Sequence, residues 1–538
     1  MTAATLTVLD CTLRDGGYYN DWDFDKALVE RYLDAAASSH VDIVELGFRF
    51  MPKAKFLGPY AYTTDRFLST LEIPDQILLG VMINASDYLK APQGAEAALL
   101  SMFNPKKESK VGLVRIAAHV AEVPNCGILI QILSGLGYRI GFNIMQSNSC
   151  TDEHLAQLVR DIKGFEHVEA LYFADSLGNM DDAETIRIIQ TLRQEWDGPL
   201  GFHGHDNMGK GLSNTLTAVK HGVTWLDATV TGMGRGAGNT QIEYLLAELQ
   251  NQKLAQVNAA PMIDLACRFF DPMKKQYGWG ANIFYYLGAQ HRVHPTYVQD
   301  MLSQDTFAPN DIAFLIEFLG QSQGSSYKAK GIANLLTARF QHADGQWSAK
   351  QMFDGRPVLL IAGGESARRH WPALEQYIET ERPVVISVNL LDFLPRKYLS
   401  AVAACHPGRL VPFMNRSWQA PVITPRQSMP DAIKERLTHC TLLDFGLHVE
   451  DNLTQINMTE HGCDLPAPLA APYAICAALA GGASRIDLAG FDGYDGRDPR
   501  YRQMNQILLD IIATAPNTPI SSLTTTHYDV PQRSIYLF

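Results

Sequence analysis

The chain has 538 residues, of which 46% are hydrophobic and 19% are charged, and its formal net charge is −12. This length predicts two or three globular domains, and the negative charge argues against a nucleic-acid or anionic-membrane partner, because both favour clustered Lys and Arg. Eight cysteines without a CxxC pair indicate reduced thiols. No stretch is long and apolar enough to span a bilayer, and the N-terminus does not resemble a signal peptide. We therefore expect a cytoplasmic protein with small-molecule ligands and no membrane partner.

The first 250 residues alternate strand-like apolar runs with helical patterns, which indicates a βα repeat with a parallel sheet. The eight predicted strands are residues 7–13, 41–46, 77–83, 113–119, 139–145, 170–174, 200–205 and 225–230. An open doubly wound sheet has the same local pattern, but eight repeats in this length favour a (β/α)8 TIM barrel. Several of these strands end in polar residues, such as Glu45, which we expect to meet at one mouth of the barrel.

The first predicted strand runs into the sequence TLRDGG at residues 12–17. A strand over residues 8–14 would turn its apolar side chains outward and its polar ones, Arg14 among them, into the barrel. Asp15 would stand at the turn that the two glycines permit, where its carboxylate could bind a metal. The alternative is a local ion pair between Arg14 and Asp15, which is common at strand ends.

The seventh predicted strand carries the sequence HGHDN at residues 203–207. Side chains two apart on a strand share a face, so His203 and His205 would project together while Phe202 faces an apolar layer. Two imidazoles on one strand are half of a metal site. Taken alone, the motif favours two polar residues that have ordinary hydrogen-bond partners, and the metal site is expected only because of the second motif, at residues 12–17.

A glycine-rich loop, TGMGRGAGN at residues 231–239, follows the eighth strand. Such loops let the backbone approach a ligand closely, but this one matches neither GxGxxG nor a P-loop, so it could equally be a flexible turn. At the barrel mouth, Asn239 could add a neutral oxygen ligand.

TLRDGG, VELGF at residues 44–48, HGHDN and GMGRGAGN, in this order, resemble the DRE-TIM metallolyase superfamily over about residues 5–250. The barrel is most similar to those of 4-hydroxy-2-oxovalerate aldolase and hydroxymethylglutaryl-CoA lyase, and VRIAAHVAE at residues 114–122 favours the aldolases. The resemblance implies that Asp15, His203 and His205 bind a divalent metal, with Asn239 as a further ligand. It also implies catalytic roles for Arg14, which would stabilise an enolate, and for Glu45.

This chain departs from the aldolase pattern at one position, and a second part of the pattern has two interpretations here. The aldolases commonly have a histidine just after RDG, whereas this sequence continues Gly17-Tyr18, so the proton shuttle assigned to that histidine does not carry over and Tyr18 is a conceivable substitute. Residues 277–300 resemble the helical region after the aldolase barrel, where a tyrosine acts as an acid/base group, and Tyr285 or Tyr286 is the nearest match. Both could instead be aromatic core residues, and His291 and His294 have the same two interpretations.

The resemblance implies a class II aldolase or lyase that joins or separates a pyruvate-type 2-oxo acid enolate and an aldehyde. A site of oxygen and nitrogen ligands favours Mn²⁺, Mg²⁺ or Co²⁺, with Zn²⁺ as a further candidate. One alternative is a Claisen-type acyl-CoA condensing or cleaving enzyme on the same barrel. Another is a non-catalytic scaffold or sensor for the C-terminal domain. We also expect a homo-oligomer.

Beyond the barrel domain (residues 1–255), helical periodicity predicts an extension over residues 256–345 that packs on the barrel. Residues 343–356 indicate a linker, and a smaller three-layer α/β domain, Rossmann-like, is predicted over 354–538, with strand-like runs at 358–361, 384–389, 410–414, 441–446 and 485–489. The apolar run at 467–482 predicts a buried helix.

A glycine turn at residues 363–366 follows the first of these strands, where backbone amides could bind phosphate. The domain distantly resembles sialyltransferase-like nucleotide-sugar domains, which makes a carbohydrate aldehyde of surface-glycan synthesis one candidate substrate. A purely structural or assembly role for this domain is the alternative.

Overall fold

The computed structural model describes residues 5–302, 309–321, 344–406, 409–410, 413, 419–429, 431–450, 453, 455–494 and 499–538. They fall into two units, the first mainly residues 5–302 and the second mainly residues 344–538. Each unit has its own hydrophobic core. The domain boundaries at residues 255, 345 and 354 stay predictions.

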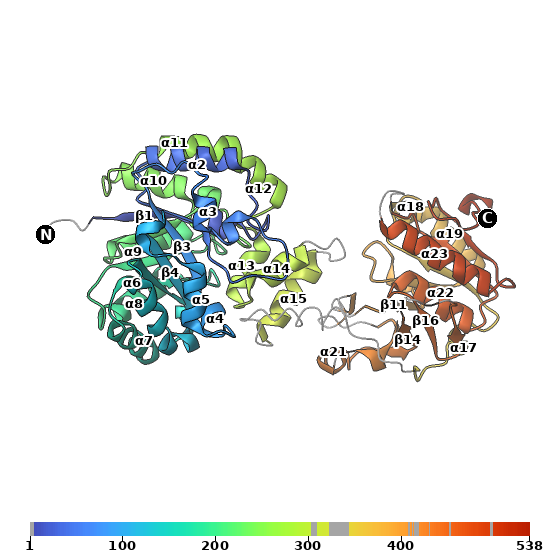
Figure 1. The fold of residues 1–538 in the computed structure, drawn as a ribbon. Coiled ribbons are helices and arrows are strands. Elements are labelled where there is room, and N and C mark those ends of the chain that lie inside the picture. The colour runs from blue at the N-terminus through green and yellow to red at the C-terminus, as the bar shows by residue number, and fades with distance from the viewer. Residues whose placement is uncertain are drawn as a thin grey trace. The chain divides into compact units, whose positions relative to one another are not determined.

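Eight parallel strands close into a barrel in the first unit (Figure 1). The last strand pairs with the first, so that Trp225 lies beside Thr7. The strands are β1 (Thr7–Asp10), β2 (Ile43–Phe48), β3 (Leu78–Asn84), β4 (Leu113–His119), β5 (Arg139–Met145), β6 (Val168–Ala174), β7 (Leu200–His203) and β8 (Trp225–Ala228). The predicted TIM barrel is therefore confirmed, with strand ends shifted by a few residues.

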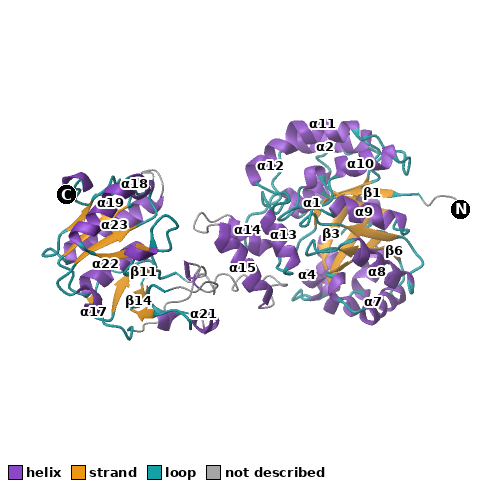
Figure 2. Ribbon diagram, turned by 180° about the vertical axis from the view of Figure 1, so that it is seen from behind, coloured by secondary structure: helices purple, strands orange, loops and turns teal. Residues whose placement is uncertain are grey.

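Helices surround the barrel strands and pack their apolar faces against the outside of the sheet (Figure 2). Asp25, Thr151 and Asp181 each precede a helix and accept one of its first backbone amides, which satisfies a donor that the helix itself cannot. The helices are α1 (Thr12–Gly16), α2 (Lys26–Ser38), α3 (Asp65–Leu68), α4 (Ala85–Leu89), α5 (Ala95–Met102), α6 (Gly127–Gly135), α7 (Asp152–Gly164), α8 (Asp182–Arg193), α9 (Gly211–Lys220) and α10 (Ile242–Asn251).

The first strand is shorter than predicted, and its two faces are reversed. β1 ends at Asp10, and the next residues form the helical turn α1, so the prediction of a strand over residues 8–14 is wrong. Leu9 and Cys11 pack inside the barrel. Asp10 points outward, where the Tyr32 hydroxyl of α2 donates to it at 2.5 Å. Because a helical turn advances only about 1.5 Å per residue, the residues of α1 stay close to the end of the barrel.

Helices follow the barrel directly, as the sequence predicts. They are α11 (Ala260–Leu265), α12 (Asp271–Tyr277), α13 (Ile283–Gln290), α14 (Pro295–Leu302) and α15 (Pro309–Gln321), with a π-helical segment, Ala266–Phe270, between the first two. α11 packs against α2 on the outside of the barrel (Figure 1). Residues 303–308 and 322–343 of the predicted extension lie outside the described residues.

The second unit is built on one sheet of seven parallel strands in the order β13-β12-β11-β10-β9-β17-β18. The helices α18 (Glu365–Arg369) and α19 (Trp371–Glu381) cover one face, and α22 (Ala470–Ala480) and α23 (Pro499–Thr514) cover the other. These strands are β9 (Pro357–Ile361), β10 (Val384–Val388), β11 (Ala401–Ala403), β12 (Val422–Thr424), β13 (Leu442–Asp444), β17 (Arg485–Ala489) and β18 (Ile520–Ser522). The predicted parallel α/β domain is confirmed, and the finer description as Rossmann-like stays a prediction.

A smaller sheet and further helices belong to the second unit. The sheet has the order β14 (Gly446–Val449), β16 (Gly462–Leu465), β15 (Met458–Thr459). The helices are α17 (Lys350–Phe353), α18 (Glu365–Arg369), α19 (Trp371–Glu381), α21 (Asp431–Arg436), α22 (Ala470–Ala480) and α23 (Pro499–Thr514).

Two sequence predictions for this half are wrong. Residues 344–356 are not a linker, because Trp347 and Phe353 are buried in the core of the second unit. Residue 343 lies outside the described residues. The predicted strand at 410–414 is absent from its described residues, since Leu410 and Phe413 are helical.

Two backbone amides of the glycine turn after β9 already have partners within the chain. The Gly364 amide donates to the Gly490 carbonyl at 3.0 Å. The Ser366 amide donates to the Asp492 carboxylate at 2.8 Å. The carboxylate of Asp492, in the segment after β17, therefore already caps this helix, and its negative charge disfavours the predicted phosphate site at residues 363–366.

In the described part of the chain, no helix is both long and apolar enough to cross a membrane. The apolar run at 467–482 forms α22, in which residues 472–478 are all buried, so the predicted buried helix is confirmed. All eight cysteines are free thiols.

Candidate active site

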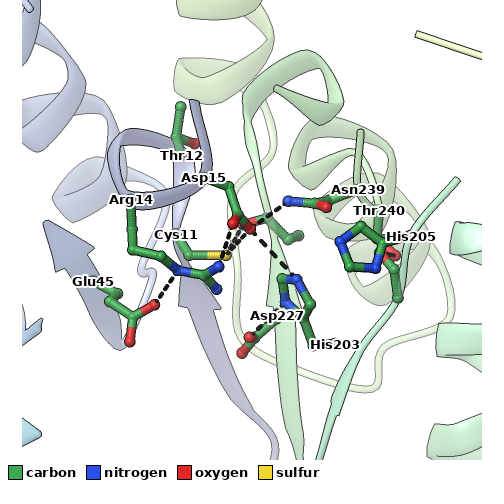
Figure 3. Close-up of polar contacts among 12 residues, drawn as sticks. Cys11, Thr12, Arg14, Asp15, Glu45, His203, His205, Asp227, Asn239 and Thr240 are labelled. Atoms are coloured by element: carbon green, nitrogen blue, oxygen red, sulfur yellow. Dashed lines mark hydrogen bonds and ion pairs between the residues drawn. The ribbon is translucent and has the colours of Figure 1, made fainter. Parts of the chain in front are cut away.

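Polar side chains from both ends of the barrel sequence meet at the carboxyl ends of the strands (Figure 3). The α1 turn carries Arg14 and Asp15, and β7 ends at His203. A β-bridge joins His205 to Asn239, which brings the glycine-rich loop beside the end of β7. The structure therefore gathers all four predicted metal ligands and the predicted enolate arginine in one cluster.

His203 is oriented by a buried carboxylate on the neighbouring strand. Its Nδ1 lies 2.9 Å from Oδ2 of Asp227, which is an acceptor, so Nδ1 carries the hydrogen. Nε2 then faces Oδ2 of Asp15 at 3.4 Å, which is long for a charge-assisted hydrogen bond. An imidazole that donates one N–H to a carboxylate and turns its other nitrogen toward a second carboxylate has the arrangement of a metal ligand.

His205 is held in the same way by a backbone carbonyl. The strand ends before it, at His203, so the predicted strand over residues 200–205 is too long. Its Nδ1 lies 2.6 Å from the carbonyl oxygen of Asp175, which leaves the lone pair on Nε2. Burial, together with His203, lowers the pKa of His205 to about 3, so the ring is neutral. The two imidazole centroids are 4.9 Å apart.

Asp15 lies between the two histidines and Arg14. Burial opposes its ionisation, but the Arg14 guanidinium and the hydrogen bond from Asn239 help to outweigh burial and lower the pKa of Asp15. The side-chain amide of Asn239 donates to Asp15 Oδ2 at 2.6 Å. The amide oxygen of Asn239 is buried and has no partner among the described residues. A cation bound here would satisfy that oxygen, so the described residues fit a divalent metal.

The glycine-rich loop can hold Asn239 in place because it is folded tightly. A Cβ on Gly238 would lie 1.8 Å from the Gly232 carbonyl oxygen, and Gly238 has φ of +80°, which disfavours other residues. The loop is therefore a fixed part of the site, not the flexible turn that was the alternative.

Arg14 has two of its nitrogens fixed by carboxylates and one unpaired. Its Nε donates to Glu45 Oε2 at 2.7 Å, and its Nη1 pairs with Asp15. Its Nη2 is buried and has no partner among the described residues. A guanidinium that keeps one buried N–H group unpaired is suited to an anionic oxygen that the chain itself does not supply.

Beneath Arg14 and His203 lies a charged network that the sequence did not predict. Arg115 of β4 donates to both oxygens of Glu45, at 2.7 and 2.8 Å, and to Asp227 Oδ2 at 2.7 Å. Arg115, Glu45 and Asp227 are all buried. The sequence did contain one indication of this network: Arg115 is a charged residue at an inward position of a barrel strand, and such a residue needs a partner on another strand.

A second group of possible metal ligands, Cys11, His203 and Asp227, also lies close together, with ligand atoms within 4.8 Å. Burial raises the pKa of the Cys11 thiol well above its usual range, so the thiol is protonated. Oδ2 of Asp227 is already shared by Arg115 and His203. Asp227 Oδ1 is buried and has no partner among the described residues, so the protonated thiol, a poor metal ligand, is what disfavours this group. His205 and Asn239 have unengaged lone pairs, which supports the set predicted from the sequence.

The sequence profile of the HMGL-like family matches residues 5–266. The N-terminal domain of a candidate aldolase from Bacteroides vulgatus has a crystal structure that is 30% identical, covers 56% of this chain and 97% of its own, and superposes with a TM-score of 0.50. The N-terminal half of this chain belongs to the HMGL-like family.

Curated relatives match the same HMGL-like half. The 4-hydroxy-2-oxovalerate aldolase of Bacillus thuringiensis is 34% identical over 172 residues, which are 31% of this chain and 50% of that protein. The oxaloacetate decarboxylase of Mycobacterium tuberculosis is 28% identical over 265 residues, 48% of this chain and 74% of that protein. The chain spans about half the length of the first curated relatives it matches.

The two tyrosine candidates of the HMGL-like unit have different surroundings. Tyr285 is buried and packs against Gly236 of the glycine-rich loop, whereas Tyr286 is 37% exposed. Burial raises the pKa of Tyr285 to about 12, so its hydroxyl is protonated at neutral pH. Tyr18 is half-buried, and the Arg235 guanidinium stacks 4.2 Å above its ring. Burial lowers the pKa of His294 to about 4, and His291 is exposed.

Proposed function

We propose that the protein is a divalent-metal-dependent aldolase or lyase that makes or breaks the C–C bond between a pyruvate-type 2-oxo acid enolate and an aldehyde. One observation carries the proposal: the unpartnered Nη2 of Arg14 lies in the same buried cluster as the unengaged lone pairs of His205 and Asn239. Membership of the HMGL-like family supports it. So do relatives named 4-hydroxy-2-oxovalerate aldolase and oxaloacetate decarboxylase.

The charges of the cluster suit an anionic substrate once a metal is bound. Arg14 and Arg115 carry two positive charges, and Asp15, Glu45 and Asp227 carry three negative ones, a net charge of −1. A divalent ion makes the site positive, and a 2-oxo acid carboxylate then neutralises it. When bound, the metal supplies Lewis-acid stabilisation of the enolate charge. Asp15, His203, His205 and Asn239 would hold it, and Mn²⁺, Mg²⁺, Co²⁺ and Zn²⁺ all remain candidates.

The residues of the chain then have separate tasks in the proposed reaction. Nη2 of Arg14 donates to the enolate oxygen as charge develops there. Glu45 fixes the direction of Arg14, and because both its oxygens accept from arginines, it does not transfer protons. Tyr285, protonated at neutral pH, is the proposed acid/base group, and Tyr18 follows Gly17, which occupies the sequence position of the missing histidine.

The proposal also includes the class of aldehyde and the role of the second unit. A carbohydrate aldehyde is one candidate, supported only by the presence of a second α/β unit in the same chain. The homo-oligomeric state, the cytoplasmic location and the division at residues 255, 345 and 354 are proposals of the same kind.

A substrate panel tests the function. The full chain is incubated with several 4-hydroxy-2-oxo acids and with oxaloacetate, and pyruvate release is followed with and without a chelator and with and without coenzyme A. We expect metal-dependent release that does not need coenzyme A. Release that requires coenzyme A would favour the Claisen-type enzyme, and metal binding with no release from any substrate would favour the scaffold or sensor.

A further inference from the structure

Arg115 is the one described residue that contacts both carboxylates of the buried charged network. It lies on β4 inside the barrel and is completely buried. Its Nε and Nη2 hold Glu45 through both oxygens, and its Nη1 holds Asp227. The ring of Tyr172 lies 4.5 Å from the guanidinium carbon. The guanidinium is therefore fixed by charged partners and by an aromatic ring.

Each of these two carboxylates also holds one functional side chain of the proposed site. Glu45 Oε2 accepts from Arg14 Nε at 2.7 Å as well as from Arg115. Asp227 Oδ2 accepts from His203 Nδ1 at 2.9 Å as well as from Arg115. Two short chains of hydrogen bonds thus start at one guanidinium, and they end at the predicted enolate arginine and at a predicted metal ligand.

We propose that Arg115 is a positioning residue that sets the direction of Arg14 and the orientation of His203 together. The inference rests on the proposed function. The inference extends the proposed function, because the metal-binding half and the enolate-stabilising half of the site both depend on one residue. That residue contacts neither the metal nor the substrate.

The planar shape of the guanidinium is what this task requires. Two parallel N–H groups meet both oxygens of Glu45, and a third nitrogen reaches Asp227 in a different direction. A lysine at residue 115 would keep the positive charge but would present a single nitrogen, which cannot hold two carboxylates in fixed directions. Loss of an outer hydrogen bond to a metal-binding histidine typically weakens metal affinity by about 10- to 100-fold.

Three variants of the full chain, compared with one control variant, separate positioning from a merely structural role. Cobalt affinity and the cobalt absorption spectrum report His203, and turnover at saturating substrate and metal reports Arg14. We expect Asp227→Asn to weaken cobalt binding about 10- to 100-fold and to change the spectrum. Glu45→Gln should keep cobalt affinity and lower turnover. Arg115→Lys should weaken cobalt binding, change the spectrum and lower turnover.

Arg49→Lys is the matched control. Arg49 is also completely buried, pairs with Asp65 at 2.6 Å, and lies 4.6 Å from the ring of Phe103, but it contacts none of the site residues. We expect Arg49→Lys to lower the thermal midpoint while cobalt affinity, spectrum and turnover stay as in the wild type.

If Arg115→Lys lowers only the thermal midpoint, as Arg49→Lys does, the proposal is overturned. Should Arg115→Lys not fold, Glu45→Gln and Asp227→Asn still decide. Two separate chains of contacts are supported if Glu45→Gln loses turnover but keeps cobalt affinity and Asp227→Asn loses cobalt affinity. Wild-type behaviour of both variants contradicts them. A wild type that binds no cobalt would overturn the proposed function and this inference with it, whereas a wild type that binds cobalt and turns over leaves the proposed function standing whatever the variants do.

Discussion

Replacing His203 and His205 together with alanine is expected to abolish stoichiometric binding of a divalent metal. The two imidazoles are the nitrogen ligands of the proposed site, and each is pre-oriented by a hydrogen bond at its Nδ1. Without them, Asp15 and Asn239 keep two oxygen donors, too few to hold a metal tightly. Metal content per chain, measured by elemental analysis after gel filtration, gives the result directly.

Two exposed histidines provide the control for this experiment. His154 and His221 lie on the surface of the same unit, so a double alanine variant there should keep one metal per chain. If the His203→Ala, His205→Ala protein also retains one metal per chain, the metal lies elsewhere and the proposed ligand set is wrong.

Arg14→Lys is expected to lower turnover on the order of 100- to 1000-fold, the usual cost of losing one donor to a developing oxyanion. Arg14 uses separate nitrogens for Glu45, for Asp15 and for the unpartnered position that we assign to the substrate. A lysine ammonium is a single point of charge and cannot serve all three directions. Steady-state turnover with saturating metal is the measurement.

Arg139→Lys is the matched substitution on the barrel. Arg139 forms a two-pronged pair with Glu169, with side chains that are 46% and 34% exposed, and exposed pairs of this kind contribute little. It should leave turnover unchanged. Near-normal turnover in Arg14→Lys would mean that Arg14 serves only as an ion-pair partner.

The direction of His203 could be predicted because strand alternation is a local rule. His203 and Phe202 point to opposite faces of β7, as the alternation requires, and Phe202 packs in the outer core. The same rule failed at the first strand, because the chain leaves the extended conformation after Asp10. Nothing in the apolar alternation of residues 8–14 shows that a helical turn replaces the strand there.

The charged network beneath the site shows what a single sequence does not contain. Arg115 and Asp227 are far apart in the chain. They become partners only because their side chains, on β4 and β8, both point into the same closed barrel. Asp492 likewise caps the helix after β9 from a distant segment, and its carboxylate disfavours the predicted phosphate site. β11 and β12 have three residues each, too few for a clear alternation to predict them.

The central claim, metal-dependent formation of a pyruvate enolate, is tested most directly by exchange of the C3 protons of pyruvate in deuterated water. The full chain is incubated with pyruvate and each candidate metal, and the deuterium content of pyruvate is measured by mass spectrometry. We predict exchange that requires the metal, stops on addition of chelator, and falls in Arg14→Lys. A protein that holds one metal per chain but exchanges pyruvate protons no faster than the chelated sample would contradict the account.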